Sequence, residues 1–134
     1  MAIAKINFKI KMDINKPKFA KIFNFEDRLV RFAGECIIFS RKLEKTFEHD
    51  YYKNQLIRSS GSSSLNYGEA QGTITDKDFI FKISLSIKEL KESRNSLKIL
   101  DYIKAGIEEE RNDLLTEVEE LIAISSKMMN NKRI

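Results

Sequence analysis

Apolar residues recur every three or four positions through most of the chain, and this spacing is typical of amphipathic helices. From Asn24 onward the pattern predicts four helices, at about 24–46, 50–71, 75–104 and 108–130. Each helix has an apolar stripe and short segments connect them, so we expect an antiparallel up-down four-helix bundle. The fold class predicted for residues 24–134 is therefore all-α.

The apolar stripes also identify the residues that we expect in the core. Cys36 lies within the stripe of the first helix, so a small core side chain is a better interpretation than a nucleophile. The core residues predicted from the first, third and fourth helices are Phe25, Leu29, Phe32, Cys36, Phe39, Leu43, Phe79, Ile83, Ile87, Leu90, Leu97, Leu100, Leu114, Val118, Leu121, Ser125 and Met128.

Several positions carry residue types that begin or end helices. Asn24 and Asp50 are expected to cap the first and second helices, because their side-chain oxygens can accept hydrogen bonds from free backbone N–H groups. Thr75 and Asp78 have the spacing of a capping box for the third helix. Gly106 is placed to end that helix in a left-handed conformation, which glycine adopts without strain.

The middle of the second helix is unusual in composition, because Gly61 interrupts a run of serines from Ser59 to Ser64. Such a run is typical of a flexible linker. Apolar residues on either side, such as Leu56 and Tyr67, keep the phase of a helix across it. We favour a continuous helix, whose small side chains would let a neighbouring backbone come close.

The first 23 residues have a different pattern. Apolar and polar residues alternate strictly through residues 3–14, which predicts a β-strand with one buried face. Such a strand could pair with another subunit or with a partner protein, or the segment could instead be a disordered solubilising tail. Six lysines stand against one aspartate here, so this basic arm is also a candidate for binding phosphate: Lys5, Lys9, Lys11, Lys16, Lys18 and Lys21.

The third helix supplies a second group of basic residues, on the positions that point away from its apolar stripe. Such a group is most often a solvated surface, but it is the best candidate nucleic-acid interface outside the arm. Its members are Lys88, Lys91, Arg94 and Lys98.

Catalytic and metal-binding patterns are lacking in the sequence. His49 is the only histidine, and we expect it in the turn between the first two helices. No Glu-x-x-His pair, phosphate-binding glycine loop or nucleophile elbow occurs. We therefore expect neither an enzyme nor a protein with a metal or another cofactor.

Composition adds further limits. Five glycines and one proline are too few for a turn-rich all-β protein, and no apolar run approaches the ~18 residues of a membrane span. The single cysteine excludes an intramolecular disulfide, which suits a reducing compartment, so we expect a cytoplasmic protein that does not contact membranes.

The second and third helices resemble a bacterial four-helix bundle family that includes proteins encoded in intervening sequences of large-subunit ribosomal RNA genes. In that family an arginine followed by small residues leads to a serine, an asparagine and a glutamate, which Arg58, Ser62, Asn66 and Glu69 match. The sequence departs from the family at three positions. Gly61 and Ser63 replace larger apolar residues, and Gly68 replaces alanine or glutamate.

The resemblance implies a homopentamer, and it extends to accessory proteins of diversity-generating retroelements, which engage a reverse transcriptase and nucleic acid. The residues it suggests for a structural or oligomer contact are Arg58, Gly61, Ser62, Ser63, Asn66 and Glu69.

Two functional hypotheses follow. The first is a non-catalytic, pentameric scaffold that binds RNA, DNA or a nucleic-acid enzyme such as a reverse transcriptase, through the arm and the basic face. The alternative is a protein-interaction module that uses its N-terminal strand without nucleic acid. Salt dependence separates them, because binding to phosphates weakens steeply as salt rises.

Overall fold

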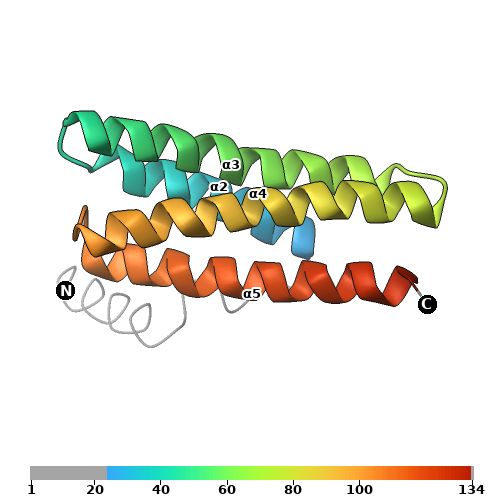
Figure 1. Ribbon diagram of the computed structural model, residues 1–134. Coiled ribbons are helices and arrows are strands. Elements are labelled where there is room, and N and C mark those ends of the chain that lie inside the picture. Colours follow the sequence, from blue (N-terminus) through green and yellow to red (C-terminus); the bar gives the residue numbers. More distant parts are fainter. Residues whose placement is uncertain (1–23, 134) are drawn as a thin grey trace, which may run out of the picture.

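The computed structural model describes residues 24–133, which form four helices in a bundle (Figure 1). The helices are α2 (Phe25–Arg41), α3 (Phe47–Gln71), α4 (Asp76–Tyr102) and α5 (Glu108–Arg133). Helix α3 packs between α2 and α4, and α5 packs against both α4 and α2, which closes the bundle. The strand predicted at 3–14, with the rest of the basic arm at 1–23, lies outside the described residues.

Ion pairs between helices show that neighbouring helices run in opposite directions. Glu69, near the end of α3, pairs with Lys82 near the start of α4. Asp76, at the start of α4, pairs with Lys132 near the end of α5. An aromatic contact between Phe25 and Tyr67 likewise joins the start of α2 to the last turns of α3.

The predicted apolar stripes form the core, except that Val30, which was expected to widen the stripe of the first helix, is 57% exposed. Leu29, Phe32, Leu90 and Leu97 are fully buried, and Phe79 and Met128 pack against the core while partly exposed. Burial explains why the helices associate, because each large apolar side chain contributes roughly 1.5–3 kcal/mol when it leaves water. The lone thiol, Cys36, is also fully buried, and burial raises its pKa, so it remains protonated as a core side chain.

Two of the expected N-caps are confirmed. The Asn24 side chain accepts a hydrogen bond from the backbone N–H of Asp27 at 3.1 Å, and Thr75 accepts one from Asp78 at 3.1 Å. Both satisfy a backbone donor that the first turn of a helix leaves free.

The prediction that Asp50 caps the second helix is wrong. Helix α3 starts at Phe47, and its N-cap is Thr46, whose hydroxyl accepts a hydrogen bond from the N–H of His49 at 3.1 Å. His49 therefore lies in the first turn of α3 rather than in the connection. The apolar pattern gave no signal for this turn, because Phe47 is 85% exposed and lies outside the buried stripe.

The first helix ends earlier than expected. Helix α2 stops at Arg41, and the N–H groups of Lys42 and Leu43 bond to carbonyls three residues back. Leu43 is nevertheless buried, so its apolar side chain continued the periodic pattern into a segment that is not helical. A residue can be buried without being helical, and the apolar periodicity indicates only burial.

The connection between α4 and α5 depends on Gly106. Its φ is +72°, the left-handed conformation expected from the sequence, but Gly106 does not end α4 as predicted. The helix stops at Tyr102, and Lys104, at a φ of +55°, is the left-handed residue that follows it. A side chain at position 106 would also collide with the core, since an added Cβ would lie 2.7 Å from Cε1 of Phe39. Within residues 24–133, no helix has the length and apolar character needed to cross a bilayer.

Candidate functional site

The serine run lies in an uninterrupted part of α3, so the helix interpretation is confirmed and the linker interpretation is wrong. Two of its buried serines, Ser59 and Ser63, face α4, where Ser93 and Ser86 are buried opposite them, whereas Ser60 lies beside Cys36 of α2. We call the α3–α4 contact the serine seam, and it consists of Ser59, Ser63, Ser86 and Ser93. Small side chains on both helices allow α3 and α4 to pack closely along it.

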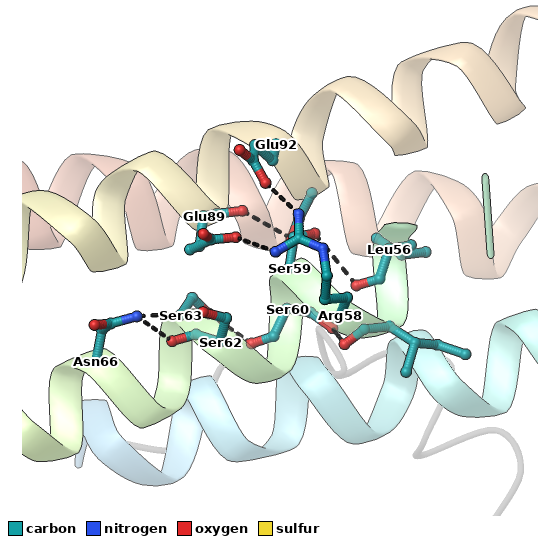
Figure 2. Close-up of polar contacts among 11 residues, drawn as sticks. Leu56, Arg58, Ser59, Ser60, Ser62, Ser63, Asn66, Glu89 and Glu92 are labelled. Atoms are coloured by element: carbon teal, nitrogen blue, oxygen red, sulfur yellow. Dashed lines mark hydrogen bonds and ion pairs between the residues drawn. The ribbon is translucent and has the colours of Figure 1, made fainter. Parts of the chain in front are cut away.

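The buried hydroxyls of the serine seam are hydrogen-bonded (Figure 2). Ser59 Oγ lies 2.7 Å from Ser93 Oγ, and Ser63 Oγ donates to the carbonyl of Ser60 at 2.7 Å. Ser86 Oγ crosses the seam and donates to the carbonyl of Ser63 at 2.8 Å. A satisfied buried hydroxyl avoids the desolvation penalty of a lone one, so the seam is polar without being destabilising.

Arg58 links α3 to α4 at the outer edge of this seam (Figure 2). Its guanidinium lies 2.5 Å from a carboxylate oxygen of Glu92 and 3.2 Å from one of Glu89. The hydrogen bond from Arg58 lowers the pKa of Glu92, whereas burial raises that of the less exposed Glu89. One guanidinium thus holds two neighbouring carboxylates, which is a structural clamp between helices.

The other family-motif residues have local roles. Asn66 donates to the carbonyl and the hydroxyl of Ser62 on the preceding turn, at 2.9 and 3.2 Å (Figure 2). Glu69 pairs with Lys82 of α4 at 2.7 Å. Together with Arg58 they tie α3 to itself and to α4, and any contact with another subunit stays a prediction.

Within residues 24–133, no neighbouring backbone makes the close contact with Gly61 that we expected, and a contact with another subunit stays a prediction. A Cβ added there would meet nothing within 4 Å, so the glycine is on the open side of α3. Ser63, in contrast, is fully buried. The small residues therefore act differently: the serines permit the α3–α4 contact, and Gly61 leaves a flat outer surface.

The outward face of α4 carries a row of residues spaced alternately by four and three, none of them acidic. We call it the α4 stripe: Lys77, Phe81, Ser84, Lys88, Lys91, Asn95, Lys98 and Tyr102. Four of the eight are lysines, and among the described residues none of these lysines forms an ion pair. Part of the stripe, with Ile87 and Glu92 at its border, lines a shallow open hollow.

The structure separates one predicted residue from this group. Arg94 points toward α5, where its guanidinium lies 3.2 Å from the carboxylate of Glu119. Lys88, Lys91 and Lys98 remain exposed on the α4 stripe. The six lysines of the basic arm lie outside the described residues.

Two aromatic members of the α4 stripe were not identified from the sequence. Tyr102 is 89% exposed and Phe81 is 58% exposed. Their spacing of 21 positions in one helix places both on the lysine-bearing face. The signal was present in the sequence, because both residues fall on the seven-residue repeat of outward positions that the lysines follow.

The sequence did not predict that two charged residues are buried. Glu117 of α5 is 1% exposed and accepts two hydrogen bonds from Arg28 of α2, at 2.5 and 3.2 Å. Arg111 is 3% exposed and donates to Asp101 and to the carbonyl of Ala105, which fixes the α4–α5 connection. Both are structural. Nowhere in residues 24–133 do three or more His, Cys, Asp or Glu side chains gather as a metal site.

Comparisons with known proteins bear on the fold and the family. A crystal structure of a protein of unknown function from the S23 ribosomal protein family of Bacteroides thetaiotaomicron VPI-5482 is similar, with a TM-score of 0.71 and 20% identity over 79% of this chain and 98% of that chain. That level of identity supports the fold alone. Comparison with curated proteins gives no match. The model of the 23S rRNA-intervening sequence protein family matches residues 25–127. The chain therefore belongs to the 23S rRNA-intervening sequence protein family.

Proposed function

We propose that this protein is a non-catalytic, homo-oligomeric scaffold, a pentamer, that binds nucleic acid or a nucleic-acid enzyme such as a reverse transcriptase. The α4 stripe is the surface that contacts the nucleic acid, and the basic arm adds to its positive charge. The observation that carries the proposal is the row of lysines on one face of a single long helix, none of which forms an ion pair within residues 24–133.

The length and charge of the α4 stripe suit a phosphate backbone. From Lys77 to Tyr102 the helix rises about 38 Å at 1.5 Å per residue. Four of the eight members of the α4 stripe are lysines and none is acidic, and Glu92 is the one acid that borders its central hollow. Contacts of this kind bind phosphates without reading sequence, and releasing the counterions of the nucleic acid favours them.

The exposed aromatic residues favour a single strand over a duplex. Bases of a single strand are free to stack on aromatic rings, and each stacked base contributes roughly 1–3 kcal/mol. Phe81 and Tyr102 offer such rings near the two ends of the lysine row. In a duplex the bases are stacked on one another, and these rings would have no partner.

Oligomerisation would raise the affinity for nucleic acid, because it repeats a surface that binds weakly on its own. In a pentamer the α4 stripe is present five times, and linked sites bind a long strand far more tightly than one site does. The pentamer follows from the resemblance of the Arg58–Glu69 segment to the intervening-sequence proteins. The Arg58 clamp supports it indirectly by holding α3 and α4 in a fixed relation.

The test is a charge reversal with a matched control. We expect K88E/K91E to weaken binding of a fluorescent single-stranded RNA, and to lower the slope of log affinity against log salt by about 2. The control K45E/K127E changes the net charge equally at exposed lysines of the α2–α3 connection and of α5. It should leave both the affinity and the slope close to those of the unchanged protein.

Equal losses in both variants would show only a general charge effect and would contradict a specific role for the α4 stripe. No salt-dependent binding in the unchanged protein would favour the alternative, a protein-interaction module. Exposed apolar residues at one end of the bundle are compatible with that alternative, namely Phe47, Tyr51, Tyr102, Ile103 and Ile107.

A further inference from the structure

The outward face of α2 carries two exposed apolar side chains on either side of a glycine. Its five outermost positions, which we call the α2 stripe, are Asp27, Val30, Gly34, Ile38 and Arg41. Val30 is 57% exposed and Ile38 is 43% exposed. Two β-branched apolar side chains one turn either side of a glycine make a flat, water-exposed face, which a partner would cover favourably.

No contact within residues 24–133 explains why position 34 is a glycine. It lies in the interior of a helix, where glycine is less favourable than alanine. An added Cβ would meet nothing within 4 Å, so no neighbouring helix needs the space. A glycine on an exposed helix face allows the backbone of another helix to approach closely.

The order of residues along the α2 stripe is self-complementary. Reading outward from Gly34, an apolar residue and then a charged one follow in both directions, and the two charges are opposite. Asp27 is in the first turn and Arg41 in the last turn of α2. No ion pair engages either side chain within residues 24–133.

We infer that the α2 stripe is a two-fold contact with a second copy of this chain, in which two α2 helices pack antiparallel. Gly34 then meets Gly34 of the other copy, and each Val30 packs on the other copy's Ile38. Asp27 pairs with Arg41 at both ends, about 21 Å apart along the helix. Antiparallel helices also place opposite ends of their dipoles together.

This contact is separate from the proposed pentamer. A two-fold contact uses the same surface on both copies, whereas a five-membered ring needs two different surfaces. The α2 contact would therefore join two rings, or two single chains if no ring forms. One short helix buries less area than the roughly 1,200–2,000 Å² of a standard interface, so the contact is expected to depend on protein concentration.

Disulfide trapping tests the geometry in the full-length chain. We expect G34C to form a disulfide-linked dimer under mild oxidation, because a residue on a two-fold axis meets its own copy. The control is G61C, another helix-interior glycine with open space around it, which should not cross-link. The natural Cys36 is fully buried and should not contribute.

Light scattering tests the charges, with far-UV circular dichroism as a check that each variant folds. D27R alone and R41D alone should each halve the mass of the assembly, and D27R/R41D should restore it, since the exchanged charges pair again. Cross-linking of G61C equal to that of G34C would overturn the inference. So would an unchanged mass in both single reversals, which would leave residues 1–23 of the same chain, or an unrelated partner, to cover this face. If the proposed pentamer failed but the α2 contact held, the unchanged chain would be a dimer and the single reversals monomers.

Discussion

Among single residues, the glycines show how differently one residue type can be used. Gly61 sits in the interior of a regular helix with open space around its missing side chain, whereas Gly106 has a left-handed backbone beneath Phe39. The same substitution should therefore have opposite effects at the two sites.

We expect Gly61→Ala to stabilise the fold by up to about 1 kcal/mol, because alanine is the better helix former and meets no obstacle. Gly106→Ala should destabilise it by at least about 1–2 kcal/mol from backbone strain alone, with the clash against Phe39 added. Urea unfolding of both variants measures this difference. A loss of stability in Gly61→Ala would mean that another subunit packs on Gly61.

At the scale of elements, the α3–α4 hairpin is held by small buried side chains rather than large ones. Ser63 is fully buried and its carbonyl accepts the hydrogen bond from Ser86 across the serine seam. Its neighbour Ser64 is partly exposed. The two positions make a matched pair for testing how tightly the helices pack.

We expect Ser63→Leu to destabilise the bundle by roughly 1–3 kcal/mol, since the added atoms would force α3 and α4 apart. Ser64→Leu should change the free energy of unfolding by no more than about 0.5 kcal/mol. Chemical denaturation of the two variants gives the comparison. Similar free energies of unfolding for both variants would mean that α3 and α4 can move apart at the serine seam without loss of stability.

On the scale of the whole molecule, α2 and α5 close the bundle through a buried ion pair. Arg28 reaches Glu117 with two hydrogen bonds and also lies 3.4 Å from Glu120. Burial raises the pKa of Glu117 although the Arg28 hydrogen bonds and charge oppose the rise. Hydrogen bonding to Glu117 in turn raises the pKa of Arg28, so Arg28 remains charged.

We expect Glu117→Ala to cost up to roughly 3 kcal/mol, because it removes the buried partner of Arg28 and leaves only the exposed Glu120, 3.4 Å away. Glu119→Ala, which removes an exposed pair with Arg94, should cost less than about 1 kcal/mol. Thermal unfolding of the two variants checks the ranking. An equal, small loss of stability in both variants would show that the Arg28–Glu117 pair does not hold α2 against α5.

The raised pKa of Glu117 also sets a sign for the pH dependence. Between the ordinary glutamate pKa and the raised one, the folded state binds more protons than the unfolded state. The stabilisation associated with protonated Glu117 is therefore present at lower pH and is lost as pH rises through that window. As pH rises through this window, the free energy of unfolding of the unchanged protein should fall relative to that of Glu117→Gln.

Much of the fold could be read from the sequence, because burying one face of a helix imposes a period that the chain must obey. The stripe through Leu29, Phe32 and Cys36 identified both the helix and its core face. Caps such as Asn24 and Thr75 were also readable, since they depend on a side chain three residues from its backbone partner. Leu43 and Phe47 broke the rule, one buried outside a helix and one exposed within it.

Only the tertiary structure decided which polar residues pair and which remain free. Arg94 and Lys91 look equivalent in the sequence, yet Glu119 of a distant segment pairs with one and leaves the other on the α4 stripe. Glu117 reads as one more residue of an acidic helix, and Arg28, 89 positions away, makes it a buried partner. Local sequence therefore determined the helices and their apolar faces, because those depend on neighbours three and four residues apart. The charges available for binding depended on contacts between distant segments, which exist only once the helices have packed.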